Sequence, residues 1–507
     1  MITLSMIVKN EEAYLKDCLN SVKDVVDEIV IVDTGSSDNT KTIAKEFGAK
    51  VFDFTWIDNF SAARNFALEN SSSEWILYLD ADERLTESSK DELKNLIKEN
   101  NNCAYFCRVR SINNLNGKSS VMDYVRLFPN DKSINFEGKV HEQIENSLRE
   151  NNISIIKSNI EILHLGYSIS ENDLQNKAKR NLNILIDEFN RQPSSYYAFQ
   201  LGQTYGILND KINAERYFLN SLKDQNLKNE YSSVANRYLA VNNAERGDWN
   251  SAHIYIEESI NADPTQPTAL IVAAKIYFYL GKREEAKSFC KKAYLMNEEF
   301  LSGKRSSHQT ILPDRRTILY EGINIAANLK DKDLFKFFYT KSGDTVNNFD
   351  NEKENRKADF INKLFENLAI TESGVDEYID LLNDESDVNM ITGLVENYYD
   401  TNLKQLLLEK MYEKFPFNTI IINKLALTLE KNNNPQKAEE LLEKSFSLNS
   451  EDPAVVFYLI SAYVKNKNFD KIAQIIETAE ENFINEPIIL QKISLLKERL
   501  SLFIKEN

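Results

Sequence analysis

The chain has 507 residues, which is too many for one core of ordinary size, so we expect two or three domains. Its net charge of -17 disfavours nucleic acid and anionic membranes as bulk partners, because both repel an acidic surface. Hydrophobic residues make up 42% of the chain, and no apolar run approaches the roughly 20 residues of a membrane-spanning helix. The composition therefore predicts a soluble protein with no integral membrane segment.

The N-terminal sequence MITLSMIVKNEE has neither the basic start nor the long apolar stretch of a secretory signal. We therefore expect a cytoplasmic protein. Its cysteines are too few and too scattered for a disulfide framework and lack the partners of a zinc site. Reduced, packed thiols are predicted at Cys18, Cys103, Cys107 and Cys290.

The first 165 residues alternate short β-branched apolar runs with helical stretches. Strands are predicted at 2–8, 28–33 and 75–80. Between the last two, Asp38 can cap a helix that continues to Phe47, where Gly48 ends it. Continuous apolar strands predict a largely parallel sheet covered on both faces, and such sheets bind ligands beyond the carboxyl ends of their strands.

After Leu165 the strand pattern gives way to apolar residues at helical spacing. Small residues recur about every 35 residues, a period typical of tetratricopeptide repeats, which this part resembles. The recurring positions include Ala214, Ala252, Ala286, Ala438 and Ala473. We expect repeats over 169–300 and 414–507, and between them, at 301–413, a helical region with degenerate or no clear repeats.

Two aspartates, Asp80 and Asp82, stand at the end of the predicted strand at 75–80. Two carboxylates at the ligand edge of a sheet can hold Mg²⁺ or Mn²⁺ that also bridges a diphosphate. The alternative is a solvated turn that leads to the helix near Glu87. Two further polar stretches end strands at the same edge: Val8–Glu12 and Val32–Thr40, the second of which suits a nucleotide or simply a capped loop.

Together with Phe60–Asn65, these stretches resemble, in order, the motifs of the family 2 glycosyltransferases of GT-A fold, and the resemblance covers residues 2–165. It implies an α/β, Rossmann-like GT-A domain over residues 1–168, followed by the all-α tetratricopeptide-repeat solenoid. It also implies a nucleotide-sugar site that includes Lys9, Asn10, Glu12, Asp33, Arg64 and Asp80.

By this resemblance, Asp33 would hydrogen-bond a uracil-type base with Glu12 beside it. Arg64 would approach the phosphates and Asp80 the ribose. Asp82 would bind the metal, Mn²⁺ or Mg²⁺.

A bacterial subgroup that includes lipooligosaccharide glucosyltransferases and peptide S-glycosyltransferases resembles the chain further, through Asp123–Phe128 and Phe136–Glu142. Arg126 would offset charge on the leaving diphosphate. The chain has only four histidines, and His141 lies in this segment beside an acid, so we expect it to take part as a catalytic group or in the metal or diphosphate site.

Transfer of the sugar requires a base that accepts a proton from the acceptor hydroxyl or thiol. The sequence does not separate Glu142, Glu137 and Asp123 as that base, and His141 is a fourth candidate. His164 occupies a position where the subgroup also has histidine, although a packing role is about as good an interpretation.

The resulting hypothesis is an inverting, metal-dependent transferase that moves N-acetylglucosamine (GlcNAc) or glucose from a UDP-sugar to a protein held by the repeats. The preferred acceptor is flagellin Ser or Thr, followed by a bacteriocin-like peptide Cys and a cell-envelope glycan. The alternative from another class is a repeat scaffold with an inactive sugar-nucleotide-binding domain. The sequence leaves the oligomeric state open.

Overall fold

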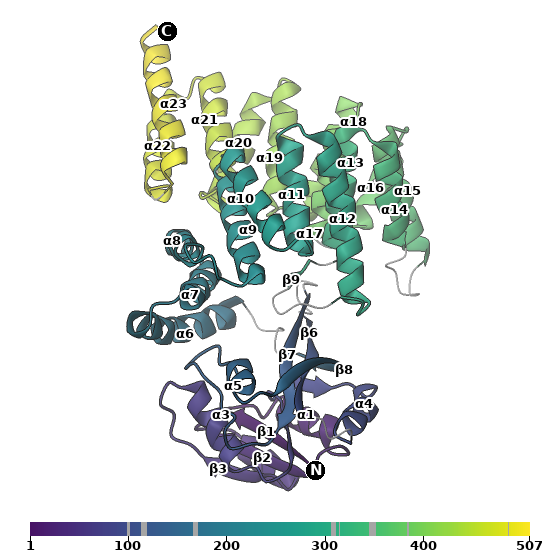
Figure 1. Ribbon diagram of the computed structural model, residues 1–507. Coiled ribbons are helices and arrows are strands. Elements are labelled where there is room, and N and C mark those ends of the chain that lie inside the picture. The colour runs from purple at the N-terminus through teal and green to yellow at the C-terminus, as the bar shows by residue number, and fades with distance from the viewer. Residues whose placement is uncertain are drawn as a thin grey trace. The chain divides into compact units, whose positions relative to one another are not determined.

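The computed structural model describes residues 1–98, 102–112, 119–165, 171–305, 311–313, 315–343, 351–382, 385–484 and 486–506 (Figure 1). The chain divides into two compact units. One contains residues 1–240, 254–270 and 295–314, and the other contains 241–253, 271–294 and 315–507. The first unit holds the sheet, and no helix within the described residues is long and apolar enough to cross a membrane.

The described strands form one mixed sheet in the order β3-β2-β1-β4-β7-β6-β8-β5, with β9 paired to β7. Their bounds are β1 Ile2–Val8, β2 Glu28–Asp33, β3 Lys50–Asp53, β4 Trp75–Tyr78, β5 Glu83–Leu85, β6 Cys103–Ile112, β7 Ser119–Pro129, β8 Ser154–His164 and β9 Ile311–Leu312. The half formed by β3, β2, β1 and β4 is parallel, as predicted. Beyond β4 the pairs β4–β7, β6–β7 and β5–β8 are antiparallel.

Helices cover the sheet because β1, at its centre, buries side chains on both of its faces. These helices are α1 Leu15–Val22, α2 Thr40–Glu46, α3 Phe60–Glu69, α4 Ser89–Leu96 and α5 Glu145–Glu150. Leu4 and Met6 of β1 pack with Leu15 and Leu19 of α1, and all four side chains are buried. Ala67 of α3 packs against β2. The four cysteines are buried and reduced, in agreement with the prediction.

The predicted helix after β2 begins slightly later than expected. α2 starts at Thr40 with Asn39 at its N-cap, but the Asp38 carboxylate still accepts a hydrogen bond from the Thr40 backbone N–H at 3.0 Å. Gly48 follows the helix with a φ of +73°, a left-handed conformation that glycine adopts without steric cost.

Between residues 171 and 506, β9 is the only strand in the described part of the chain, and all other regular elements are helices. The helices are α6 Glu171–Arg191, α7 Ser195–Ile207, α8 Lys211–Ser221, α9 Asn229–Glu245, α10 Trp249–Ala262, α11 Pro267–Tyr279, α12 Arg283–Leu301, α13 Arg315–Leu329, α14 Lys332–Gly343, α15 Asn351–Glu366, α16 Glu372–Asp380, α17 Glu385–Glu396, α18 Thr401–Lys414, α19 Thr419–Lys431, α20 Pro435–Leu448, α21 Pro453–Asn466, α22 Phe469–Asn482 and α23 Pro487–Glu506.

Small residues lie where paired helices touch, as expected for such repeats. A Cβ on Gly202 of α7 would lie 2.8 Å from the ring of Phe218 in α8. Gly322 of α13 stands in the same relation to Phe338 of α14, at 2.5 Å. The α13–α14 pair therefore retains one repeat contact within the region where the sequence pattern is degenerate.

One strand lies where the sequence predicted only helices. β9 follows α12 and pairs antiparallel with the start of β7, Leu312 opposite Ser119. Phe300 of α12 and Leu312 are buried against Val121 of β7. The Arg108 guanidinium on β6 donates to the Phe300 carbonyl. A two-residue strand has no periodicity of its own, so only the tertiary contact reveals it.

Candidate active site

The loops after β1 and β2 hold each other at the carboxyl edge of the sheet. The Asn10 backbone N–H donates to Ser36 Oγ at 2.9 Å, and Asn10 Oδ1 accepts from the Ser37 N–H at 2.8 Å. Glu12 Oε2 accepts from the Asn39 N–H at 3.0 Å. Asn10 and Glu12, which the sequence places at the nucleotide, therefore shape the loop that would receive it, while Lys9 is exposed beside them.

Asp33 ends β2 and is almost fully buried, with 1% of its surface exposed. Its Oδ1 accepts from the backbone N–H groups of Gly35, at 3.0 Å, and Ser36, at 2.8 Å. Its Oδ2 is buried without a hydrogen-bond partner among the described residues. A buried carboxylate oxygen is costly to leave unpaired, so this atom is suited to a donor that arrives with a ligand.

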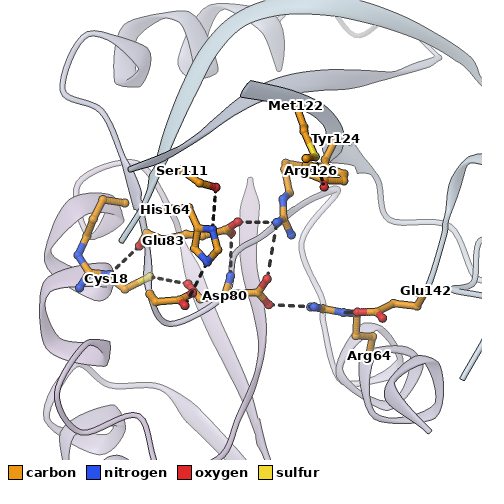
Figure 2. A network of polar contacts seen from close by, with 12 residues as sticks. Cys18, Arg64, Asp80, Glu83, Ser111, Met122, Tyr124, Arg126, Glu142 and His164 are labelled. Atoms are coloured by element: carbon orange, nitrogen blue, oxygen red, sulfur yellow. Dashed lines mark hydrogen bonds and ion pairs between the residues drawn. The ribbon is translucent and has the colours of Figure 1, made fainter. Parts of the chain in front are cut away.

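Asp80 lies between two arginines (Figure 2). Its Oδ1 accepts from Arg64 Nη2 at 2.9 Å, and its Oδ2 is 3.6 Å from Arg126 Nη2. Burial opposes ionisation of Asp80, but the two guanidinium groups outweigh it and hold the pKa well below its usual range. The site therefore keeps a carboxylate and two cations together at the end of β4.

Glu83 completes this group, although the sequence analysis assigned it no role. Arg126 Nη2 donates to Glu83 Oε1 at 2.5 Å, and the Asp80 backbone N–H donates to Glu83 Oε2 at 2.9 Å. Burial raises the pKa of Glu83 to about 7, against the opposing charge of Arg126. The only sequence signal was the position of Glu83 directly after Asp82.

Arg126 reaches the group because β7 is irregular there. Leu127 pairs with Tyr105 and Val125 with Phe106, so Arg126 opposes no residue of β6. Such a bulge re-aims a side chain. The Arg126 guanidinium lies 4.1 Å from the centre of the Tyr78 ring, a contact that adds cation–π attraction to the ion pairs.

The imidazole beside Asp82 belongs to His164. Its Nε2 is 3.1 Å from Asp82 Oδ2, and its Nδ1 is 3.0 Å from Ser111 Oγ. The pairing of β5 with β8, with Glu83 opposite His164, brings them together. Burial lowers the pKa of His164, but the bond and charge of Asp82 outweigh it and raise the pKa overall. A tertiary contact thus favours the site role over the packing role for His164.

Glu11 is a further acid that the sequence analysis did not single out. Burial raises its pKa to about 7, and the charge of Asp82 adds to the rise, with a smaller contribution from Asp80. Lys177 of α6 acts in the opposite direction. Glu11, Asp80 and Asp82 therefore lie close enough to affect one another, and a bound cation would relieve their repulsion.

The motifs at 60–65 and 136–142 are one structural unit. Asn65 Nδ2 donates to the Phe136 carbonyl at 3.0 Å, and its Oδ1 accepts from the Phe136 N–H at 2.7 Å. The Phe60 N–H donates to the Lys139 carbonyl at 2.8 Å. From the same helix, Arg64 Nε donates to Glu142 Oε1 at 2.6 Å. Arg64 thus bridges Glu142 and Asp80 (Figure 2).

The four candidate bases occupy different places. Glu142 is held by Arg64, and Glu137 is exposed in the same loop. His141 is exposed, with a φ of +55°. Asp123 lies on β7 opposite Arg108, with Lys157 Nζ 3.8 Å from its carboxylate. Because side chains alternate along a strand, the Asp123 side chain points to the opposite face of the sheet from that of Tyr124.

Asp82, the predicted metal ligand, and His164, which was not predicted as one, lie close together. Two protein ligands at right angles on an octahedral ion, with bonds of about 2.1 Å, lie about 3 Å apart. The 3.1 Å between Asp82 and His164 fits this spacing. The described residues hold no group of three His, Cys, Asp or Glu side chains placed around one ion, so a diphosphate and water would supply the other ligands.

Comparison with protein families agrees with both parts of the chain. Residues 3–156 match glycosyl transferase family 2, and residues 267–300 match a tetratricopeptide repeat. The chain therefore carries a family 2 glycosyltransferase domain at its N-terminus and at least one tetratricopeptide repeat in its helical part, as its motifs indicated.

Curated relatives match over part of their length. A TPR repeat-containing protein of Synechococcus elongatus is 41% identical over 29% of this chain and 36% of its own. The prophage-derived glycosyltransferase SunS of Bacillus subtilis is 30% identical over 44% of this chain and 53% of its own. The chain thus spans about half or less of the relatives it matches. Among solved structures, S. aureus TarS 1–349 in complex with UDP-GlcNAc aligns with a TM-score of 0.29 and 14% identity, over 51% of this chain and 91% of TarS 1–349.

Proposed function

We propose that the chain is an inverting glycosyltransferase that moves GlcNAc or glucose from a UDP-sugar to a protein acceptor. The observation that carries the proposal is the buried, unpaired Oδ2 of Asp33, at the same sheet edge as Asp80 and Asp82. The N3–H of uracil is a donor that would satisfy this oxygen. A uracil ring bound at Asp33 would direct the diphosphate along this edge of the sheet toward Arg64 and Asp82.

Asp82 and His164 would hold Mn²⁺ or Mg²⁺. When bound, such an ion supplies charge that stabilises the leaving diphosphate. Lys9, Asn10 and Glu12 would line the loop around the base. The sequence also offered His141 as a ligand, and we give that place to His164, because His164 already contacts Asp82.

In the reaction, a base accepts the proton of the acceptor hydroxyl or thiol as its oxygen or sulfur attacks the anomeric carbon. The bond from that carbon to the diphosphate oxygen breaks, and UDP leaves. Arg64 and Arg126 are placed to offset the charge that develops on the diphosphate. We propose that the catalytic base lies in the 137–142 loop, at His141 or Glu142, because this loop adjoins Arg64. Glu137 and Asp123 remain the alternative bases.

The acceptor is a protein because solenoid repeats commonly hold polypeptides. We propose flagellin Ser or Thr first and a peptide Cys second, as the sequence analysis did.

The test measures binding of UDP by calorimetry and release of UDP from UDP-GlcNAc and UDP-glucose with Mn²⁺, without acceptor and with flagellin or cysteine-containing peptides. We expect binding and turnover in the wild type and loss of turnover in Asp82→Ala. Asp17→Ala is a matched control, because it makes the same substitution at an exposed position of α1. A wild type that neither binds UDP nor releases it from either donor would refute the proposal and favour the inactive scaffold.

A further inference from the structure

The loop that carries His141 and Glu142 is closed and strained. Glu137 and Gln143 exchange two backbone hydrogen bonds, each of 2.9 Å, and so join the two ends of the loop. Inside it, Gly138 has a φ of +87° and His141 a φ of +55°. Residues with a Cβ rarely adopt a left-handed conformation, so other contacts must hold His141 in it.

Tyr196, in the first turn of α7, supplies such contacts. Its hydroxyl accepts from Gln143 Nε2 at 3.0 Å and donates to the His141 carbonyl at 3.3 Å. Burial raises the pKa of Tyr196, so the hydroxyl keeps the proton that it donates. The ring packs against Tyr231 of α9, with centroids 5.7 Å apart, which fixes the position of the hydroxyl.

Other contacts from α6 and α7 act on the same loop. Val140 is buried with Leu185 of α6 and Leu201 of α7. Lys139 Nζ is 3.1 Å from Glu188 Oε1 of α6. The loop is therefore held on the sheet side by Asn65 and on the other side by the first two helices after the sheet domain.

The loop position determines where the charged groups lie. Glu142 stands between the two residues that Tyr196 contacts, and it holds Arg64, which in turn contacts Asp80. A shift of the His141–Gln143 backbone would move Glu142 and so change the placement of Arg64. Displacements of about 1 Å in such groups can lower the rate of a reaction by about 100-fold.

We infer that Tyr196 is a positioning residue of this active site, through which the first helices of the repeat region fix the geometry of the transferase. The inference rests on the proposed function. Tyr196 touches neither donor nor acceptor in this scheme. Its hydroxyl fixes the left-handed backbone at His141, and the loop then orients Glu142 and Arg64.

The test is Tyr196→Phe in the full chain, which removes the hydrogen bonds of the hydroxyl to Gln143 and His141 and keeps the ring contacts. We expect kcat for UDP release from UDP-GlcNAc to fall about ten-fold or more, with KM for the donor within about two-fold. Gln143→Leu should lower kcat similarly, and the double variant should lose little more than either single one, because the two share one interaction. Amide hydrogen exchange of residues 137–143 should become faster in Tyr196→Phe.

Tyr205→Phe is the control, because Tyr205 lies further along α7 and its ring stacks on Tyr217 of α8, with centroids 5.5 Å apart. It should leave kcat and loop exchange unchanged. A Tyr196→Phe variant with wild-type kcat and wild-type exchange at 137–143 overturns the inference. A variant whose KM for the donor rises as much as its kcat falls, and whose unfolding temperature is also lowered, overturns it as well. If the wild type releases no UDP, the proposed function is wrong, whereas the exchange measurement still reports whether Tyr196 holds the loop.

Discussion

Replacing Asp33 by Asn should change which base the protein prefers. The amide oxygen can keep the place of Oδ1, which accepts from the N–H groups of Gly35 and Ser36. The amide NH₂ then occupies the place of the buried, unpaired Oδ2. Uracil presents an N–H at position 3, so two donors would face each other in the variant.

The size of the effect follows from the bond that is lost. A hydrogen bond to a charged group contributes about 1.5–3 kcal/mol, which corresponds to roughly 10- to 150-fold in Kd for UDP. Cytosine has an acceptor at N3, so the affinity for CDP should fall much less or rise. Stability without nucleotide should change by only about 1 kcal/mol, because the bonds of Oδ1 remain.

Calorimetric titration of UDP and CDP with Mn²⁺ measures both affinities, and urea unfolding measures stability. Asp17→Asn serves as the control, because that side chain is exposed on α1. An unchanged ratio of the UDP and CDP affinities would show that Asp33 does not face the base. Equal loss of both, together with a large loss of stability, would indicate that the loop had collapsed.

Three further outcomes are expected. Glu28→Gln should destabilise the protein at pH 7 by up to ~3 kcal/mol. Burial raises the pKa of Glu28, but hydrogen bonds from Lys50, Thr3 and Ser72 outweigh it and lower the pKa to about 2. The stabilisation by ionised Glu28 is complete above pH ~4.5 and is lost as pH falls toward 2. In urea unfolding, the difference in free energy of unfolding between the wild type and Glu28→Gln should therefore be smaller at pH 3 than at pH 7. An equal difference at both pH values would contradict the low pKa of Glu28. Asp82→Ala should abolish the dependence of UDP affinity on Mn²⁺, measured by calorimetry with and without EDTA, and retained dependence would remove Asp82 from the metal site. Gly202→Ala should lower the free energy of unfolding by about 1–3 kcal/mol, because its Cβ would lie 2.8 Å from the Phe218 ring, and an unchanged unfolding midpoint would mean that the helices separate freely.

The sequence predicted the structure well where a single strand and the loop after it determine the position of a residue. β1 and β2 were predicted at their observed bounds, because continuous apolar runs end in polar motifs there. The position of Asp80 and Asp82 just after a buried strand was predicted for the same reason. The half of the sheet formed by β7, β6, β8 and β5 was not predicted, since its strands carry polar residues such as Arg108 and Asp123.

The partners within the site were less predictable than its members. His164 meets Asp82 only because β5 pairs with β8, and Arg126 meets Glu83 only because β7 bulges. Neither pairing leaves a local pattern in the sequence. Tyr196 has no motif at all, and its role follows from the packing of α7 against the loop.

The pairing of β9 with β7 has a consequence for synthesis on the ribosome. Residues up to 165 contain every other strand of the described sheet, yet the side of β7 that faces away from β6 at Ser119 and Ser120 gains its partner only when Leu312 has emerged. Until then the nascent chain presents open backbone groups that another strand can pair with. Translation speed or chaperone binding between α6 and α12 should therefore govern the yield of native protein, and a gene cut after the sheet domain should give an aggregating product.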